Sequence, residues 1–458
     1  MAKNKEGETK QIDSLDHSPG DKIKITSTDG VFEGVMIPEP ELLDMNSIIL
    51  KLSTGYNIGI DKKKIKKVEL LEKYKKPYYK KPSIQQNTML PTVSLFSLGG
   101  TISSKVDYTT GGVSADYTAE DLIEMCPELS SYANFKAQKV MSILSEDITV
   151  KDWQRIAEIA AKELNSGIRG LILTQGTDTL HYSTAALSFM LRNLNKPVIF
   201  TGAQRSIDRG SSDAFMNLVC ATVAASKFDG AVVASCMHAT SDDEHCILIR
   251  GTKVRKMHSS RRDAFRPINE LPLAKVYTDG NIEILNENYP KISEKSKNGV
   301  DKTDGSSSED VIADTAFDEK VALIKVYPGF NKDVIDFYLD KGYHGLVIEG
   351  TGFGNVATLH ESNSLLLALK RAADEKVPVV MTSQTIYGRT NPYVYTTMRK
   401  LNIGTKVIYA EDILPEVAYI KLGWVLGHTK DYDEVKKMML TNVAGEISSR
   451  TEPEAFLY

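Results

Sequence analysis

The most constraining feature of this sequence is a regular alternation of short apolar runs with segments of helical spacing, which begins near residue 92. Such runs are typical of strands, and strands joined through helices of this length form right-handed βαβ units in a mainly parallel sheet. The sequence therefore predicts a large α/β domain over residues 91–290. Its strands are predicted over residues 92–97, 170–174, 197–200 and 231–234, and its helices after Thr118, after Thr149 and over 179–193.

The same alternation returns further along the chain and predicts a second, smaller α/β domain over residues 319–440. Its strands are predicted over 321–326, 345–348 and 378–381, and its helices near 331–341 and 362–374. Between the two domains, Ser293–Asp310 holds a single apolar residue, Val300, and cannot bury a core face. We therefore interpret residues 291–318 as a polar surface linker and 441–458 as a C-terminal tail.

The N-terminal region has a different pattern, with short strand candidates broken by glycines. This spacing suits a small antiparallel β-barrel over residues 15–72 of an N-terminal domain, 1–72. The segment from Lys62 to Lys81 contains ten lysines, and residues 73–90 are interpreted as a Lys/Tyr-rich linker. The barrel could contact a partner, contact RNA through these lysines, or steady an assembly, and the lysine run could equally be a solvated face.

Composition limits the possible partners and the compartment. A formal net charge of −4 is far from the basic field of a protein that binds nucleic acid by bulk charge. Four cysteines without a CxxC spacing do not form a disulfide framework in a chain of this size. No secretory signal and no apolar run of membrane-spanning length occur. We expect a cytoplasmic protein without a membrane segment.

Three predicted strands are followed by turns rich in glycine and hydroxyl groups. These turns are Ser97–Ser104, Thr174–Thr179 and Thr201–Ser206. Ligands of open α/β sheets bind beyond the carboxyl ends of the strands, so the three turns predict a site at one edge of the sheet. The first turn has neither dinucleotide nor P-loop spacing, so a phosphate cradle is not indicated. A single Gly-Gly-Thr could also be only a turn with a helix cap.

Thr177 and Asp178 form the most informative pair, because a hydroxyl nucleophile needs a nearby base. The histidines do not follow the chain orders of hydrolase triads, and no G-x-S-x-G motif occurs. A lysine among other cations can have its pKa lowered enough to act as a base, and Arg250–Phe265 supplies one. Taken alone, that stretch could instead be a solvated or anion-binding loop.

The segment Cys236–Cys246 contains two cysteines and two histidines, which in principle could bind zinc. Its spacing matches none of the common zinc patterns, and the loop could instead contribute to the rim of an active site. We therefore predict no metal site.

Three motifs in order resemble the threonine-dependent, bacterial-type L-asparaginase family over about residues 90–440. They are Leu98–Ile102, Gly176–Leu180 and Arg250–Phe265. The N-terminal barrel, Asp242–Cys246 and Arg250–His258 resemble one branch more closely, the archaeal-type glutamyl-tRNA(Gln) amidotransferase D subunits. The resemblance implies an α/β fold of two asparaginase-like domains with parallel sheets, preceded by a small all-β, Sm- or SH3-like barrel.

The resemblance also implies roles for particular residues. Thr101 matches the family's mobile-loop threonine and is the expected nucleophile, although the second threonine is an alternative. Thr177, Asp178 and Lys256 match the assisting threonine, aspartate and lysine. Lys256, and not Lys253, is chosen because it precedes a histidine by two residues and a phenylalanine by nine.

A second segment and two departures complete the comparison with the family. Ser145, Glu146 and Asp147 match the segment that binds the substrate's α-amino and α-carboxylate groups. Leu98 stands where the family usually has threonine, and Gln175 where it usually has histidine. We expect these departures to affect the shape and mobility of the pocket rim more than the reaction.

The D-subunit resemblance implies a glutaminase that releases ammonia from glutamine for a partner E subunit. That partner, with ATP and Mg²⁺, would amidate Glu-tRNA(Gln), and this chain itself would hold no cofactor. A homodimer within a heterotetramer is the implied assembly. Two alternatives are a free-standing cytoplasmic L-asparaginase and an RNA-binding protein with a decayed hydrolase domain. The barrel argues against the first, and the intact threonine, aspartate and lysine motifs argue against the second.

Overall fold

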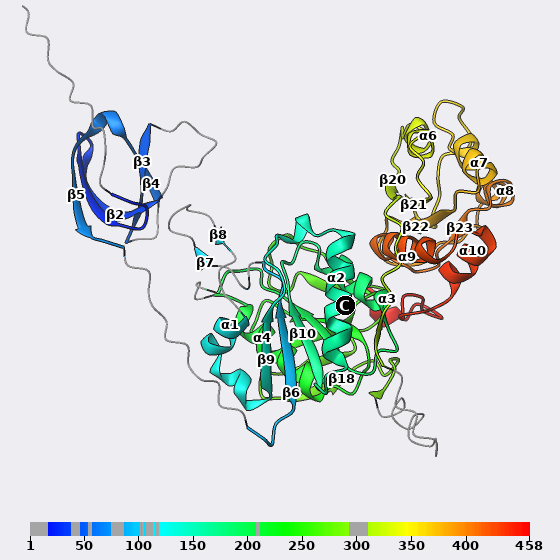
Figure 1. The fold of residues 1–458 in the computed structure, drawn as a ribbon. Coiled ribbons are helices and arrows are strands. Elements are labelled where there is room, and N and C mark those ends of the chain that lie inside the picture. The colour runs from blue at the N-terminus through cyan, green and yellow to red at the C-terminus, as the bar shows by residue number, and fades with distance from the viewer. Residues whose placement is uncertain are drawn as a thin grey trace, which may run out of the picture. The chain divides into compact units, whose positions relative to one another are not determined.

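The computed structural model describes residues 17–37, 46–53, 57–74, 87–100, 102, 105–106, 113–114, 119–207, 211–292 and 310–458. The chain divides into two compact units (Figure 1). The first comprises residues 1–83 with 105–114, and the second comprises 84–104 with 115–458. Most of each predicted linker, 73–90 and 291–318, lies outside the described residues, and so does the expected nucleophile Thr101.

The first unit is built on a five-stranded antiparallel sheet in the order β4-β3-β2-β1-β5, drawn in blue in Figure 1. Alternate apolar side chains of its strands form a small core that includes Ile23, Ile25 and Leu50. This confirms the predicted all-β domain. Its strands are β1 (Lys22–Ser27), β2 (Gly30–Ile37), β3 (Ser47–Leu52), β4 (Asn57–Asp61) and β5 (Ile65–Glu72), with a short 3-10 turn, η1 (Lys62–Lys64).

The last strand of this sheet, β5, was not predicted as a strand, because the lysine run hides it. Ile65 is buried and Val68 packs against the core, while Lys66 and Lys67 are exposed. β5 pairs antiparallel with β1, from Lys22 opposite Glu72 to Ser27 opposite Ile65. The described half of the lysine run is therefore structural, with its charges directed to solvent.

The second unit contains an eight-stranded sheet in the order β18-β17-β14-β13-β12-β10-β6-β9. The five strands from β13 to β9 are mutually parallel, and β14, β17 and β18 extend the sheet antiparallel. The predicted mainly parallel α/β fold is confirmed. The strands are β6 (Thr92–Ser97), β9 (Asn134–Lys139), β10 (Gly170–Thr174), β12 (Val198–Thr201), β13 (Val233–His238), β14 (Cys246–Arg250), β17 (Ala274–Val276) and β18 (Ile282–Ile284).

Helices cover both faces of this sheet, as the alternation of side chains along β10 requires. Leu171 and Leu173 belong to one hydrophobic core with residues of α2 and α3, and Ile172 belongs to a second core with residues of α4. The helix α2 begins after Thr149, as predicted, with a capping box formed by Thr149 and Asp152. The helices are α1 (Ala119–Met125), α2 (Val150–Leu164), α3 (Leu180–Met190) and α4 (Ala214–Lys227), with 3-10 turns η3 (Pro127–Ser131) and η4 (Ser145–Asp147).

The C-terminal part of the second unit has its own four-stranded parallel sheet, β20-β21-β22-β23. The strands are β20 (Val321–Lys325), β21 (Gly345–Gly350), β22 (Val379–Ser383) and β23 (Ile408–Tyr409). The helices are α6 (Asp333–Asp340), α7 (Leu366–Asp374), α8 (Thr396–Thr405), α9 (Pro415–His428) and α10 (Tyr432–Leu440), followed by η5 (Pro453–Ala455).

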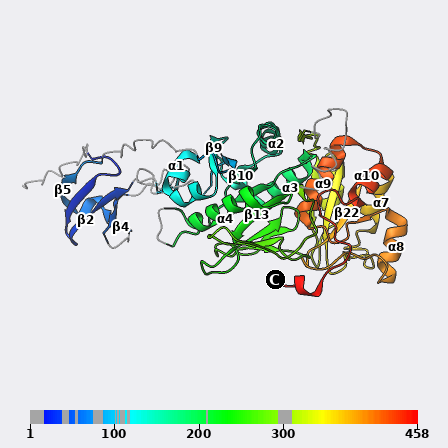
Figure 2. The ribbon, with the colours of Figure 1, turned by 90° about the horizontal axis from the view of Figure 1, so that it is seen from below.

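The two sheets of the second unit share one hydrophobic core across α3 and α9, which lie side by side in Figure 2. The rings of Phe189 on α3 and Trp424 on α9 stack with centroids 5.9 Å apart. Both helices are apolar nearly all round, as expected for helices covered on all sides.

Three two-stranded ribbons complete the fold. They are β7 (Lys105–Val106) with β8 (Val113–Ser114), β11 (Leu191–Arg192) with β19 (Ile312–Ala313), and β15 (Val254–Lys256) with β16 (Phe265–Pro267).

All four cysteines are buried and unpaired. Across the described ranges, none of the helices has the length and apolar character needed to cross a membrane.

Candidate active site

The turn after β10 lies at the carboxyl edge of the sheet, between the turns that follow β6 and β12. The Leu98 N–H donates to Thr174 O, and the Gln175 N–H donates to Thr201 O, both over 2.9–3.0 Å. A Cβ added at Gly100 would lie 2.2 Å from the backbone nitrogen of Gly176. Glycine is therefore required for the first two turns to meet, and the predicted convergence of these loops is present.

Thr177, Asp178 and Lys256 meet in this turn, as the family resemblance predicted. The Lys256 ammonium donates hydrogen bonds to Thr177 Oγ1 over 2.8 Å and to Asp178 Oδ1 over 2.6 Å. The Lys256 side chain is 9% exposed, whereas that of Asp178 is 66% exposed. One end of the pair thus lies inside the protein and the other in water, which is an arrangement suited to a substrate arriving from solvent.

The predicted substrate-binding segment forms the short 3-10 turn η4 against the same loop. Ser145 is buried, and a Cβ added at Gly176 would lie 3.0 Å from Ser145 Oγ. The Thr179 hydroxyl, at the cap of α3, donates to the backbone carbonyl of Ser145. Glu146 and Asp147 follow in this turn with exposed side chains, available to charged groups of a ligand.

The two departures from the family pattern are buried and do not form an exposed rim. Leu98 is fully buried and packs in the large core of the second unit. Gln175 is also fully buried, and its Oε1 accepts no hydrogen bond from the described residues. Both side chains lie beneath the turns and not at the surface, and their effect on the shape and mobility of the pocket rim stays a prediction.

The cationic stretch 250–265 is not an uncompensated positive field, because each of its lysines and arginines pairs with a carboxylate. The pairs are Arg250–Glu270, Lys253–Asp412, Arg255–Glu416, Lys256–Asp178, Arg261–Asp263 and Arg262–Asp243. Unpaired cations close to Lys256 therefore do not explain how this lysine could act as a base. The alternative of a free anion-binding loop loses its support for the same reason.

His181, on the first turn of α3, was not singled out in the sequence. Its ring is buried, and its Nδ1 has no hydrogen-bond partner among the described residues. Burial, together with the positive charges of Arg255 and Lys256, lowers the pKa of His181 to about 3. It is therefore neutral at physiological pH. Its place four residues after Thr177, at the start of the predicted helix, was the signal available in the sequence.

The segment Cys236–Cys246 lies in and beside the antiparallel pair β13–β14. His238 Nδ1 lies 2.6 Å from Asn217 Oδ1, and its Nε2 lies 3.1 Å from Asp243 Oδ1. Cys246 Sγ lies 3.4 Å from the same asparagine oxygen. Within the part of the chain that the structure describes, no three histidine, cysteine, aspartate or glutamate side chains converge as metal ligands.

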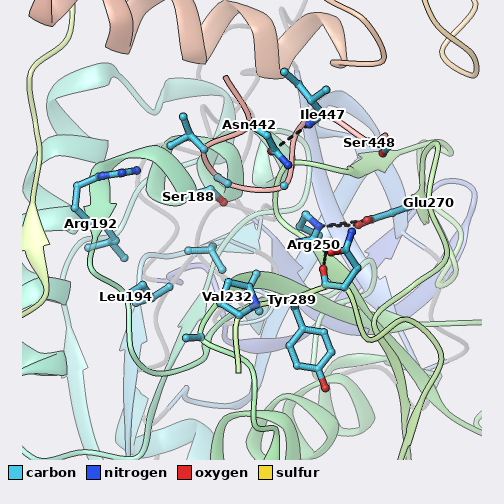
Figure 3. A pocket seen from close by; sticks show the side chains of 18 of the residues that line it. Ser188, Arg192, Leu194, Val232, Arg250, Glu270, Tyr289, Asn442, Ile447 and Ser448 are labelled. Carbon is cyan, nitrogen blue, oxygen red and sulfur yellow. Dashed lines mark hydrogen bonds and ion pairs between the residues drawn. The ribbon is translucent and has the colours of Figure 1, made fainter. Parts of the chain in front are cut away.

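A cavity of about 520 Å³ lies at the opposite, amino edge of the sheet (Figure 3). Its wall includes the buried Arg250, whose Nε donates to Glu270 Oε1 over 3.0 Å, and the segment 442–448 after α10. None of the sequence-predicted site residues within the described ranges lines it. The sequence-predicted residues that the structure brings together lie at the polar turn after β10, away from this cavity.

Comparison with known families agrees with this geometry. Residues 92–290 match the family "Asparaginase, N-terminal", and residues 320–439 match the "Glutaminase/Asparaginase C-terminal domain". An L-asparaginase structure from Thermococcus kodakarensis superimposes with a TM-score of 0.67 at 29% identity, covering 78% of this chain and 99% of that one. The fold and its site thus define an asparaginase-like hydrolase with an added N-terminal domain.

The added domain and the full-length relatives specify the family further. Residues 17–71 match the "GatD N-terminal domain". The D subunit of glutamyl-tRNA(Gln) amidotransferase from Pyrococcus furiosus is 50% identical, covering 93% of each chain. That of Methanothermobacter thermautotrophicus is 44% identical, covering 96% of this chain and 97% of its own. The chain belongs to the family of glutamyl-tRNA(Gln) amidotransferase D subunits.

Proposed function

We propose that this chain is the glutaminase subunit of a tRNA-dependent amidotransferase. It hydrolyses the side-chain amide of glutamine, and a partner E subunit uses the ammonia to convert Glu-tRNA(Gln) to Gln-tRNA(Gln). The observation that carries the proposal is the contact of Lys256 with Thr177 and Asp178 in a chain with near full-length D-subunit relatives. Because the final substrate is an aminoacyl-tRNA, the proposed reaction is a cytoplasmic one.

In the proposed reaction a threonine hydroxyl attacks the amide carbon of glutamine and forms an ester with the enzyme. The hydroxyl proton passes to the departing nitrogen, so ammonia leaves and the acyl group stays on the threonine. Water then cleaves the ester to give glutamate and restores the hydroxyl. Thr101 is the proposed nucleophile, with Thr177 as the alternative.

Lys256 and Asp178 are proposed to carry the proton between these steps. Neutral His181, buried behind them, does not compete as the base, since its pKa of about 3 makes it a poor proton acceptor. Asp178 fixes the direction of the Lys256 ammonium through the 2.6 Å contact. Backbone N–H groups of the glycine turns at the sheet edge are proposed to stabilise the oxyanion.

Recognition of the amino acid is proposed for the η4 turn. The carboxylates of Glu146 and Asp147 are suited to the substrate's α-ammonium group, and Ser145 with backbone N–H groups to its α-carboxylate. This set is complementary to free glutamine, whose amide would extend toward Thr177.

The remaining chemistry is assigned to the partner. ATP and Mg²⁺ are proposed to bind the E subunit, while this chain contributes no cofactor. The proposed assembly is a homodimer of this chain within a heterotetramer that binds Glu-tRNA(Gln).

Coexpression with an E subunit from the same organism tests the proposal. The complex is expected to amidate Glu-tRNA(Gln) with glutamine as donor, and the Lys256→Met complex only with ammonium chloride. Lys275→Met, a lysine-to-methionine change on β17 away from the site, is the matched control. Glutamine-dependent amidation by the Lys256→Met complex would contradict the proposal.

The second candidate is a free-standing L-asparaginase, favoured by the structural similarity to the T. kodakarensis enzyme. Steady-state ammonia release by the chain alone separates the two. Rapid turnover of asparagine with no response to an E subunit or to tRNA supports the asparaginase function, and stimulation of glutamine turnover by the complex supports the glutaminase function.

A further inference from the structure

The strand that carries Lys256 belongs to neither of the main sheets of the second unit. β15 pairs only with β16 in a two-stranded ribbon among the described strands, with Val254 opposite Pro267 and Lys256 opposite Phe265. A two-stranded ribbon is marginally stable without further support. The position of the Lys256 ammonium therefore depends on what holds this ribbon in place.

Alternate residues of the ribbon strand face different partners. Val254 is fully buried in the core, and Lys256 is directed to Thr177. Arg255, on the other face of the strand, and Lys253, in the turn just before it, both contact residues of the C-terminal domain. The Lys253 ammonium lies 2.7 Å from Asp412 Oδ2, and Arg255 Nη1 lies 3.2 Å from Glu416 Oε2.

The first of these acceptors is fixed by several bonds. Asp412 lies between β23 and α9 with its side chain fully buried, as is that of Lys253. Its Oδ1 accepts a hydrogen bond from the Ser448 N–H over 3.0 Å. Asn269, beside the ribbon, donates to the Asp412 carbonyl and the Gly388 carbonyl. Asp412 is therefore a rigid anchor for the ribbon.

The second acceptor depends on the ribbon for its own charge balance. Glu416, in the first turn of α9, is 2% exposed, and its Oε1 has no hydrogen-bond partner in the described part of the chain. Burial raises the pKa of Glu416, while Arg255 acts in the opposite direction. Half-satisfied buried carboxylates are costly, so the Arg255 contact constrains both the helix and the ribbon.

We propose that Asp412 and Glu416 of the C-terminal domain position Lys256 for catalysis through Lys253 and Arg255. The proposal rests on the proposed catalytic role of Lys256. It assigns to α9 and the β23–α9 loop a part in the reaction without contact with the substrate. Displacement of a reacting group by about 1 Å can cost on the order of 100-fold in rate, so even a small shift of the ribbon is measurable.

The test uses the full chain with its E subunit and measures kcat and KM for glutamine. Arg255→Met and Glu416→Met are each expected to lower kcat by roughly 10- to 100-fold, with KM changed less than about threefold. Arg255→Lys is expected to retain more of kcat than Arg255→Met, and it provides a second variant where the methionine protein fails to fold. Arg371→Met, which removes an exposed ion-pair residue of α7, is the matched control.

The double variant Arg255→Met/Glu416→Met separates positioning from stability. Removing both charges relieves the unpaired buried carboxylate, so the melting temperature is expected to recover toward that of the unmutated protein while kcat stays low. Recovery of kcat together with stability, or single variants with kcat within twofold of the unmutated protein, overturns the proposal. An active Lys256→Met protein would instead overturn the proposed function, so the two failures are distinct.

Discussion

Two lysines three residues apart, Lys253 in the turn before β15 and Lys256 at the end of β15, pair with carboxylates in opposite surroundings. Lys253 and its partner Asp412 are both fully buried, whereas Lys256 is buried but its partner Asp178 is mostly in water. A carboxylate in water needs no cation for its own solvation, so the Lys256–Asp178 pair can change during a reaction at little cost to the fold. The Lys253–Asp412 pair cannot, because a lone charge in the interior is strongly unfavourable.

The largest expected effect is on activity, at the half-exposed pair. Lys256→Met is expected to reduce glutamine hydrolysis on the order of 1,000-fold or more, because it removes the group that contacts both Thr177 and Asp178. The melting temperature is expected to stay close to that of the unmutated protein. Ammonia release and thermal unfolding measure the two effects. If Lys256→Met lost much stability but kept its activity, the Lys256–Asp178 pair would be structural and not catalytic.

At the buried pair the expected effect is on stability. Lys253→Met leaves the buried Asp412 carboxylate with only the more distant Arg389 guanidinium, 3.7 Å from its Oδ1, and the free energy of unfolding is expected to fall by about 3–5 kcal/mol. The double variant Lys253→Met/Asp412→Leu is expected to recover most of this loss. Urea unfolding of the single and double variants measures both values, and a loss below about 1 kcal/mol in the single variant contradicts the assignment.

The first unit offers an intermediate case, in which the carboxylate is buried and the lysine exposed. Burial alone would raise the pKa of Asp21, but backbone N–H groups of Tyr74 and Ser18 and the Lys73 ammonium outweigh it and lower the pKa to about 2. Ionised Asp21 therefore stabilises the folded state above its ordinary pKa of 3.8, and this contribution is lost as pH falls toward 2.

Asp21→Asn is accordingly expected to lower the free energy of unfolding of this unit by about 1–2 kcal/mol at pH 7. The difference from the unmutated protein is expected to shrink between pH 4 and pH 2. This difference in the free energy of unfolding is measured by hydrogen exchange of the backbone amides of β1, on the full chain at several pH values. A difference that grows as the pH falls contradicts the assignment.

The smallest effect is expected where both partners are exposed. Lys64 lies 2.8 Å from Asp29, with half of each side chain in solvent. Lys64→Gln is expected to leave the free energy of unfolding nearly unchanged, and to have less effect still at high salt. Urea unfolding at two salt concentrations tests this, and a loss comparable to that at Lys253 would show that exposure does not govern these pairs.

The sequence predicted the central strands well because their apolar runs are short, buried and bounded by glycine-rich turns. β6 and β10 begin and end at the predicted residues. β5 was missed because lysines fill its exposed positions, and the charged run obscured the apolar pattern that begins with the buried Ile65. The antiparallel strands β14, β17 and β18 were missed because they follow no helix.

The candidate site could be predicted only in part. Thr177 and Asp178 are adjacent, and family spacing was needed to select Lys256 as their partner. Asp412 and Glu416 were not predictable in this way, since each lies about 160 residues from the cation that it binds and no local pattern marks a long-range ion pair. Thr101 lies outside the described residues, and its role stays a prediction.

The distance along the chain between Lys253 and Asp412 also orders events during synthesis. A ribosome that adds roughly 5–20 residues per second needs on the order of 10–30 s to make the 159 residues that separate them. Throughout that interval the nascent large domain carries Lys253 without its carboxylate and α3 without α9. The shared core of the second unit is therefore completed late, after the C-terminal segment has been translated, and by our proposal Lys256 reaches its catalytic position only then.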